Sequence, residues 1–354
     1  MNVLHRSLCA AALALSASTA SAGAYSGVYV FGDSLADSGN NYLVFQNGPL
    51  PPPLGAVPTP RPDAVITTPT PLSSNTFIPT LTYAPAAPYP FGTYSNGQTW
   101  VGAFGAALGL TILPSLAGGT NYAYGGATTG GVSAFPPSLG QQVDQFVALP
   151  GSAPSDALYV IAGGGNDVRA VLNAITPSTT PAEVQAAILA ASLAFAQNVV
   201  GMIVKLADEG ADDFVVWNVP NAGIAPAIAL QGPASQSVGT LTSSTMNAYL
   251  AAALAMLPPQ IASDVRVFDL FGLVTGAVAT PAAFGFDNVT LACGANPGAC
   301  TDPSKWLFWD GIHPTSGGHA LISEAMLARV PLPATLPLLA IGVAGLWLRR
   351  RRAA

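Results

Sequence analysis

The sequence predicts an α/β protein in which a mostly parallel sheet lies between two helix layers, a three-layer α/β/α sandwich. Short apolar runs of strand length alternate along the chain with longer stretches whose apolar residues recur at helical spacing. Several of these runs end in glycine and polar residues, as parallel strands do where they enter a site-forming loop. The chain has 354 residues, 50% of them hydrophobic and 8% charged, which is sufficient for a large core.

Four apolar runs are the predicted strands. The first, Val28 to Phe31, leads into Gly-Asp-Ser-Leu, and the second lies within 158–167 and ends in a glycine-rich loop. The others lie within 213–220 and 265–270. Parallel sheets build their sites from the loops that follow the carboxyl ends of the strands. Ser34 and Asn166 each follow a strand in this way.

The clearest predicted helix lies between Thr180 and Gly210. Thr180 fits the N-cap, Pro181 the first helical position, and Glu183 the third position of a capping box. Gly210 stands just beyond the expected end. The predicted apolar face comprises Val184, Ile188, Phe195, Val199, Met202 and Leu206. Further helices are predicted around Met246 to Leu257 and from about Ser316 to Arg329.

The first 22 residues have the pattern of a secretory signal peptide. A basic start is followed by an apolar stretch and by Ala20-Ser21-Ala22, which fits cleavage after Ala22. The alternative is a buried N-terminal helix. On the first interpretation, residues 23–329 form the folded domain.

Residues 330–354 form an apolar segment that ends in four arginines. The run from Val330 to Leu348 is barely long enough to cross a bilayer, and its three prolines weaken a continuous helix. The arginines Arg349 to Arg352 are typical of a stop-transfer anchor, whose positive end stays in the cytoplasm. The alternative, a last core helix, does not explain the arginines.

Residues 49–90 hold thirteen prolines in forty-two positions. Such a segment cannot be helical and makes poor sheet, so we expect an irregular insertion into the folded domain. The sequence leaves open whether this insertion lines a substrate site or has no role in substrate binding.

The charge balance excludes nucleic acid as an expected partner. The chain carries 11 basic and 17 acidic residues, a net charge of −6. Removing both end segments takes away Arg6 and the four tail arginines, which leaves 6 bases against 17 acids, or −11.

Two cysteines lie outside the signal peptide, Cys293 and Cys300, in the stretch CGANPGAC. In an exported protein such a pair is expected to form a disulfide, which would contribute roughly 2.5 kcal/mol on the chain-entropy model. A metal site is the alternative, but no further cysteine or nearby histidine is available as a ligand.

A nucleophilic serine needs a base, and only two histidines remain beyond the signal peptide. His313 has Asp310 three residues before it, close enough in a short turn to orient the imidazole. His319 has Ser316 at the equivalent position and falls within the last predicted helix, which suggests a structural or solvent role. Two glycine-rich stretches, 121–128 and 163–167, could supply donors to an oxyanion, the second through Asn166.

Four stretches match, in order, the motifs of one enzyme family. They are Gly32–Leu35, Asn121–Ala127, Gly163–Asp167 and Asp310–Pro314. Over about residues 28 to 328 the chain resembles the GDSL, or SGNH, serine esterases and lipases. The stretches YSNGQTWV (94–101), NVPNAGIAPA (218–227) and FGFDNVTLAC (284–293) are similar to the branch of plant-type GDSL lipases and bacterial lecithinase-haemolysin-like enzymes.

The resemblance implies the SGNH-hydrolase, flavodoxin-like form of the sandwich and a set of site residues. The implied roles are Ser34 as nucleophile, His313 as base and then acid, and Asp310 as its orienter. The implied oxyanion hole consists of the Ser34 N–H, the Gly126 N–H and the Asn166 side chain; Gly126 is preferred to Gly125 because it stands five residues after Asn121. Asp33, Asp37 and Asn40 are expected to shape the loop of the first motif.

The end of the chain resembles a second kind of signal. Val330 to Ala334 reads Val-Pro-Leu-Pro-Ala, a variant found in the PEP-CTERM sorting signals of Gram-negative bacteria. The resemblance implies that an exosortase-type membrane protease removes the tail, with the protein ending at the cell surface or outside the cell after transient anchoring in the inner membrane.

The sequence as a whole therefore predicts an exported serine ester hydrolase that forms an acyl-enzyme on Ser34 and needs no metal or organic cofactor. Short-chain carboxyl esters, phospholipids and acetylated polysaccharides all remain possible substrates, and the oligomeric state stays open. No Gly-x-Ser-x-Gly elbow and no Gly-x-Gly-x-x-Gly spacing occurs in the chain, which disfavours an α/β-hydrolase and a Rossmann enzyme. The alternative is a catalytically idle surface or matrix-binding protein that keeps the fold.

Overall fold

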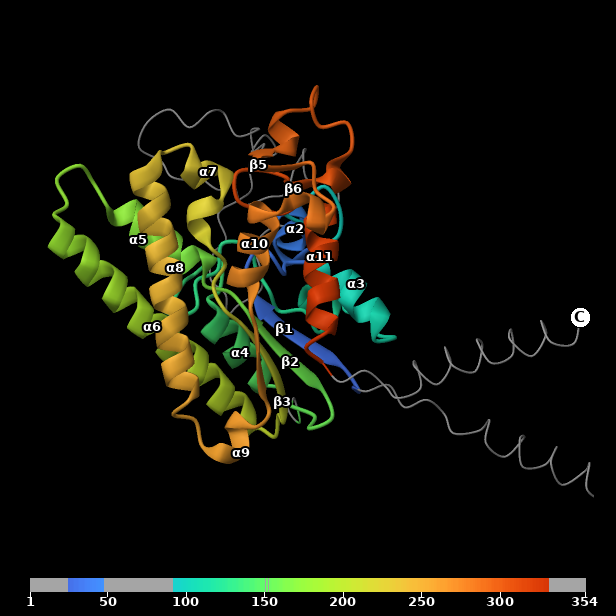
Figure 1. Cartoon of the computed structure of the whole chain (residues 1–354). Helices are drawn as coiled ribbons and strands as arrows, with labels where there is room; N and C mark the ends of the chain where they lie inside the picture. Colours follow the sequence, from blue (N-terminus) through green and yellow to red (C-terminus); the bar gives the residue numbers. More distant parts are fainter. Residues whose placement is uncertain (1–24, 48–91, 150, 152, 331–354) are drawn as a thin grey trace, which may run out of the picture. The chain divides into compact units, whose positions relative to one another are not determined.

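The centre of the computed structural model is a parallel sheet of four strands in the order β1-β2-β3-β4 (Figure 1). The structure describes residues 25–47, 92–149, 151 and 153–330. The expected signal peptide (1–22), the proline-rich insertion (49–90) and residues 331–354 of the tail lie outside the described residues. The strands are β1 (Val28–Gly32), β2 (Leu158–Ala162), β3 (Asp213–Trp217) and β4 (Val265–Phe268).

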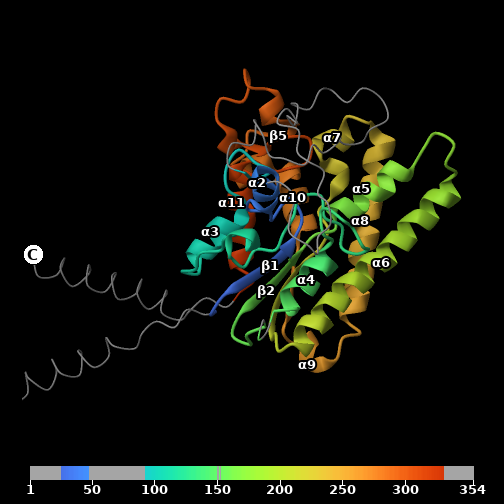
Figure 2. The ribbon, with the colours of Figure 1, turned by 180° about the vertical axis from the view of Figure 1, so that it is seen from behind.

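Helices cover both faces of this sheet, so the predicted three-layer α/β/α architecture is confirmed (Figures 1 and 2). On one face α4, α6 and α8 pack over the strands, and on the other face lie α3 and α11. The helices are α2 (Asn40–Asn47), α3 (Trp100–Ala107), α4 (Leu139–Val147), α5 (Gly165–Ala174), α6 (Pro181–Asp208), α7 (Pro226–Ala229), α8 (Pro233–Leu254), α9 (Pro259–Ala262), α10 (Leu270–Ala279) and α11 (Ser316–Leu327).

The strands are apolar because both of their faces are covered. Every residue of β2 is buried, and its Tyr159 packs against Phe146 of α4 and Phe214 of β3. On the opposite face the rings of Trp100 and Trp217 lie 5.0 Å apart between their centroids. The sheet therefore packs against helices on both of its faces.

Helix α6 begins and ends where its sequence signals predict. The Thr180 hydroxyl accepts a hydrogen bond from the Glu183 N–H at 3.3 Å, and the Glu183 carboxylate accepts one from the Thr180 N–H at 2.7 Å, which completes the capping box. By length and composition α6 is apolar enough to cross a membrane. However, eight of its side chains are buried, and they pack toward the sheet and α8.

Two predicted boundaries are wrong. Helix α8 begins at Pro233, well before the expected start near Met246, because the first half of this helix is built from small and polar residues that give little helical periodicity. The strand expected over 265–270 ends at Phe268. Asp269 is instead the N-cap of α10, whose side chain accepts a hydrogen bond from the Gly272 N–H at 2.8 Å.

The chain segment 120–124 runs beside β1 and extends that edge of the sheet. The Val30 N–H donates to the Thr120 carbonyl at 3.0 Å, and the Tyr122 N–H donates to the Val30 carbonyl at 2.7 Å. Farther along, the Tyr124 N–H donates to the Gly32 carbonyl at 3.1 Å. These bonds bring the glycines that follow Tyr124 to the end of β1, where Ser34 lies.

A smaller parallel sheet of β5 (Asn288–Ala292) and β6 (Trp306–Phe308) precedes the loop that carries His313. The predicted disulfide between Cys293 and Cys300 is confirmed, with the two Cα atoms 5.3 Å apart. It packs against Trp306 and thereby ties the loop after β5 to the strand before His313.

Candidate active site

The site residues predicted from the sequence lie at the carboxyl edge of the parallel sheet. Ser34 lies two residues beyond β1, and Asn166 lies in the first turn of α5, directly after β2. His313 follows β6 and precedes α11. Three segments that are far apart in the chain therefore contribute to one site, as expected for a parallel α/β sheet.

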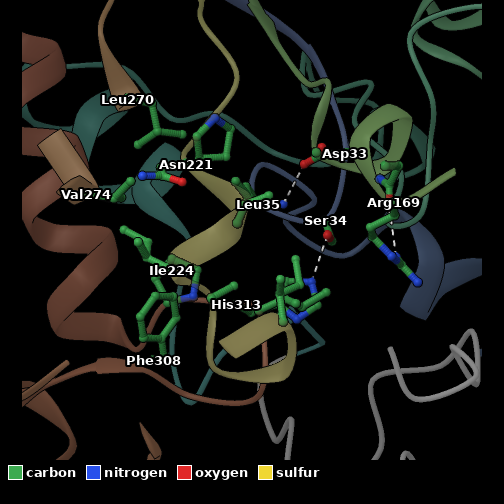
Figure 3. Close-up of a pocket in the computed structure, with 18 of the residues that line it drawn as sticks. Asp33, Ser34, Leu35, Arg169, Asn221, Ile224, Leu270, Val274, Phe308 and His313 are labelled. Carbon is green, nitrogen blue, oxygen red and sulfur yellow. Dashed lines mark hydrogen bonds between the residues drawn. The ribbon is translucent and has the colours of Figure 1, made fainter. Parts of the chain in front are cut away.

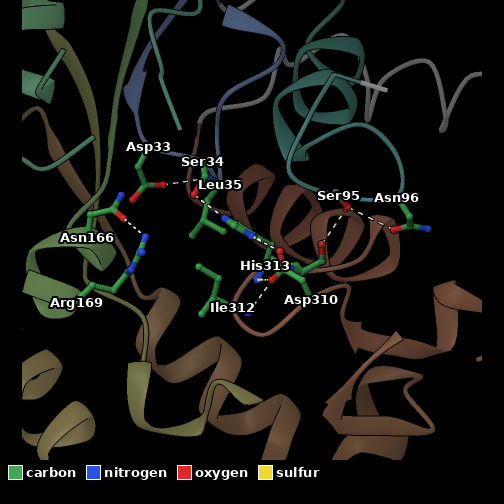
Figure 4. A network of polar contacts seen from close by, with 11 residues as sticks. Asp33, Ser34, Leu35, Ser95, Asn96, Asn166, Arg169, Asp310, Ile312 and His313 are labelled. Carbon is green, nitrogen blue, oxygen red and sulfur yellow. Dashed lines mark hydrogen bonds and ion pairs between the residues drawn. The ribbon is translucent and has the colours of Figure 1, made fainter. Parts of the chain in front are cut away.

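Ser34, His313 and Asp310 form a continuous chain of hydrogen bonds (Figure 4). The Ser34 Oγ lies 2.8 Å from the His313 Nε2, and the His313 Nδ1 lies 2.6 Å from the Asp310 Oδ2. The other oxygen of Asp310 accepts the backbone N–H groups of Ile312 and His313, at 2.8 and 2.7 Å, which fixes the carboxylate. With the Nδ1 proton held by Asp310, the Nε2 is free to accept the serine proton.

A segment that the sequence reasoning did not assign to the site holds the His313 loop. The Ser95 hydroxyl donates to the Pro314 carbonyl at 2.9 Å, and the Asn96 Oδ1 accepts the Ser316 N–H at 2.7 Å. The Tyr94 ring packs beside the imidazole, with centroids 5.3 Å apart. In the sequence, residues 94–96 belong to the stretch YSNGQTWV, which resembles the family but does not by itself indicate a contact with the His313 loop.

The Asp37 carboxylate ties the first and second motifs together. It accepts the N–H groups of Gly39, Asn40 and Asn41 in its own loop and the N–H of Gly125 at 2.9 Å. Asp37 thus shapes the loop, as the sequence predicts. The Gly125 N–H is occupied by this bond.

Two backbone N–H groups near Ser34 have no hydrogen-bond acceptor among the described residues, those of Ser34 itself and of Gly126. Gly126 has a φ of +87°, a left-handed conformation that glycine adopts without the usual steric cost. An N–H that is not paired within the protein is available to a ligand. Of the two candidate glycines, Gly126 is therefore the one with a donor to offer.

Both the oxygen and the nitrogen of the Asn166 side-chain amide make hydrogen bonds. Its oxygen accepts a hydrogen bond from the Arg169 Nη1 at 2.8 Å, and its nitrogen donates to the Ala127 carbonyl at 2.8 Å. The second N–H of the amide has no acceptor among the described residues. Asp167 accepts the Thr129 N–H and hydroxyl, so the start of α5 is anchored on the loop that carries Gly126.

The turn into α5 depends on Gly164. This residue has a φ of +112°, and a Cβ there would lie 2.7 Å from the side chains of Phe195 and Val219. The backbone therefore approaches α6 too closely for any other residue. This close approach places Asn166 at the end of β2.

The model of the family described as GDSL-like lipase/acylhydrolase matches residues 28–326. The chain belongs to this family. Because the match spans all four motifs, it includes each of the site residues described above.

Bacterial and plant relatives support the same assignment. Esterase EstA of Pseudomonas aeruginosa is 31% identical over 94% of this chain and 51% of its own length. An uncharacterized protein of the trpE-trpG intergenic region of Pseudomonas putida is 29% identical over 95% of this chain and 54% of its own. A GDSL esterase/lipase of Arabidopsis thaliana is 25% identical over 85% of this chain and 86% of its own. The chain thus spans about half the length of these bacterial relatives.

In this GDSL-family protein a cavity of about 100 Å³ opens beside Ser34 (Figure 3). Ser34, His313, Asn166 and Arg169 line one part of it, and most of the other lining residues are aliphatic side chains and Phe308, with Asp33 and Asn221 as further polar ones. Among the described residues, no group of three or more histidine, cysteine or acidic side chains could hold a metal ion.

Asp33 lines the same cavity and directly precedes Ser34 in the chain. Its Oδ1 accepts the Leu35 N–H at 3.0 Å. Burial raises the pKa of Asp33 to about 6, although this hydrogen bond and the nearby His313 and Arg169 act in the opposite direction. Like Asp37, Asp33 takes part in the geometry of the loop that presents Ser34.

His319 lies in α11 and is buried, so it has a structural position without access to solvent. Neither ring nitrogen has a hydrogen-bond partner in the part of the chain that the structure describes. Burial, and to a lesser extent the proximity of His313, lowers the pKa of His319 from 6.5 to about 3. Of the two histidines, His313 lies in a loop at the sheet edge, where it contacts Ser34.

We expect His319 to make the fold sensitive to acid. Between pH 6.5 and 3 the unfolded chain binds a proton at this position that the folded chain does not, so the free energy of unfolding falls as the pH decreases. The raised pKa values of Asp33 and Asp37 act in the opposite direction between pH 6 and 3.8, because there the folded chain binds the extra protons.

The comparison of wild type with His319→Leu isolates the histidine, since both proteins keep the two aspartates. From pH 7 to pH 4, urea unfolding should show the wild type losing about 3 kcal/mol relative to the variant. If the free energy of unfolding changes equally with pH in the two proteins, His319 does not titrate in this way.

Proposed function

We propose that this protein is a carboxylic ester hydrolase that forms an acyl-enzyme on Ser34. The observation that carries the proposal is the hydrogen-bonded series from Ser34 through His313 to Asp310. A serine hydroxyl is a weak nucleophile at neutral pH unless a base takes its proton as it attacks. The alternative of an idle binding protein has no observation in its favour.

In the first half of the reaction, the Ser34 Oγ forms a bond to the ester carbonyl carbon while its proton moves to the His313 Nε2. Asp310 stabilises the imidazolium that results. The carbonyl oxygen, now negative, accepts hydrogen bonds from the N–H groups of Ser34 and Gly126 and from the Asn166 amide. The bond to the alcohol oxygen then breaks, and that oxygen takes the proton from His313.

In the second half, a water molecule replaces the alcohol beside His313. Its oxygen bonds to the acyl carbon as the Nε2 accepts one of its protons, and the bond to the Ser34 Oγ then breaks. The proton returns from the Nε2 to Ser34, and the carboxylic acid leaves. One water is consumed, and the enzyme is regenerated.

The direct test is release of p-nitrophenol by the purified protein from p-nitrophenyl esters of several acyl lengths. The proposal requires turnover of at least one of them. Absence of turnover for every acyl length, from acetate to palmitate, would contradict it.

The oxyanion role of Asn166 gives a second test. Asn166→Ala should lower kcat by roughly 10²–10³-fold with little change in KM, because the lost donor acts mainly on the charge of the transition state. Asn198→Ala is the matched control, since Asn198 also bonds the loop after Gly126, through Thr129, but does not line the Ser34 cavity. Equal losses in both variants would indicate a structural effect and contradict the role.

We also propose that residues 1–22 direct export and that residues 330–354 carry a sorting signal that is removed. The support is the sequence pattern alone, because both segments lie almost wholly outside the described residues. Mass spectrometry of the extracellular protein should find a start near Gly23 and loss of the chain beyond about Pro333. An intact arginine tail in that fraction would contradict the sorting proposal.

A further inference from the structure

The cavity beside Ser34 has two chemically different ends (Figure 3). At one end lie the catalytic groups together with Arg169, which contacts Asn166. At the other end lie Leu270, Val274 and Phe308. Leu270 and Phe308 are almost fully buried, at 1% and 6% exposure, so this end is walled by the packed interior.

Much of the remaining lining is aliphatic. It includes Leu35, Ile224, Ala225, Ile228 and Ile312. The polar side chain Asn221 lies beside Leu270 and Val274 (Figure 3), and its amide is engaged by the hydroxyls of Thr240 at 2.8 Å and Thr275 at 3.3 Å. Apart from the second N–H of the Asn221 amide, no described side chain on this part of the wall offers a charge or an unpaired donor to a polar ligand.

We propose that this cavity binds the acyl part of the substrate and that it selects short unbranched acyl groups of about four carbons. The inference rests on the proposed ester hydrolase function. An apolar cavity of about 150 Å³ accommodates benzene, which has six carbons. By the same ratio, the 100 Å³ beside Ser34 holds about four.

The two halves of the reaction decide which part of the ester occupies the apolar end. The alcohol must leave and a water molecule must take its place beside His313, which requires a path to solvent. The acyl group stays bonded to Ser34 throughout this exchange. The apolar end, which is enclosed by buried side chains, is suited to the acyl group. The polar end is suited to the alcohol and to the water that replaces it.

Helix α10 sets the length of the acyl site. Leu270 and Val274 are four residues apart on this helix and so lie on the same face, toward the cavity. The hydrogen bond between Asn221 and Thr275 ties α10 to the loop after β3. Val274 is only half-buried, so its side chain can be changed with little effect on the core.

The experiment measures kcat/KM for p-nitrophenyl acetate, butanoate, hexanoate, octanoate and dodecanoate. The wild type should prefer butanoate, with octanoate lower by at least about tenfold, since even a single methylene that does not fit a pocket can have an effect of this size. Val274→Ala should move the optimum toward hexanoate or octanoate. Val274→Phe should reduce butanoate turnover by about tenfold or more and acetate turnover less.

Val278→Ala is the matched control for Val274→Ala. Val278 lies one turn farther along α10 and does not line the cavity, although the apolar cluster against which it packs includes Phe308. Its chain-length profile should equal that of the wild type.

A second readout is the rate at which alkylphosphonate p-nitrophenyl esters of the same lengths modify Ser34, because this rate does not depend on deacylation.

The possible outcomes separate this inference from the function on which it rests. Turnover with a flat profile, or with dodecanoate as the best substrate, would overturn the short-acyl selection and leave the hydrolase function standing. Equal profiles for Val274→Ala and Val278→Ala would overturn the placement of the acyl group in this cavity. No turnover of any ester together with no modification of Ser34 would overturn both proposals.

Discussion

Replacing Ser34 by alanine is expected to lower kcat for ester hydrolysis by a factor on the order of 10⁶, because the group that forms the acyl-enzyme is lost. The Ser34 Oγ makes its hydrogen bond to the His313 Nε2, so the change removes one contact and leaves the rest of the loop in place. The free energy of unfolding should therefore change little. The measurement is p-nitrophenyl ester turnover, with urea unfolding alongside.

Ser192→Ala is the control for this substitution. Ser192 is also buried, and its hydroxyl donates to the Ile188 carbonyl within α6. Ser192 does not line the cavity. It should keep wild-type turnover. Residual activity of the Ser34 variant within about tenfold of the wild type would exclude Ser34 as the nucleophile.

Replacing Asp310 by asparagine is expected to lower kcat by about 10⁴-fold. Asparagine can donate a hydrogen bond where the carboxylate only accepts, so the imidazole loses the partner that holds its proton on the Nδ1. It also carries no charge to stabilise the imidazolium. The loss should be largest in kcat, measured on the ester for which the wild type has the highest turnover.

Asp167→Asn is the matched control for Asp310→Asn. Asp167 is a half-buried carboxyl at the same edge of the sheet, but it bonds Thr129 and has no hydrogen bond to His313. Its amide can still accept from Thr129, so kcat should fall far less. Similar losses in the two variants would contradict the specific role of Asp310.

The sequence predicts the parallel sheet and α6 well because their signals are local. The strands are short apolar runs, and the capping box of Thr180 and Glu183 needs only four consecutive residues. The first half of α8 has no such signal. Its small and polar residues become helical in contact with the loop after β3, where Thr240 and Ser243 bond Asn221 and Ala222, a tertiary effect that periodicity does not reveal.

The candidate site was predictable where few residues could do the chemistry. The scarcity of histidine and the short spacing between Asp310 and His313 single out one pair. The contacts of Ser95 and Asn96 with the His313 loop span about 220 positions of sequence, and no local pattern indicates them. The choice between the two glycines likewise depends on a distant contact, that of Gly125 with Asp37.

The central claim is that Ser34 is the activated nucleophile, and covalent modification tests it most directly. The purified protein is treated with a fluorophosphonate, digested and analysed by mass spectrometry. We predict a single adduct on the peptide that contains Ser34, absent from Ser34→Ala and strongly slowed in His313→Ala. An unmodified Ser34 beside a protein that still hydrolyses esters, or an adduct on another serine that persists in Ser34→Ala, would contradict the account.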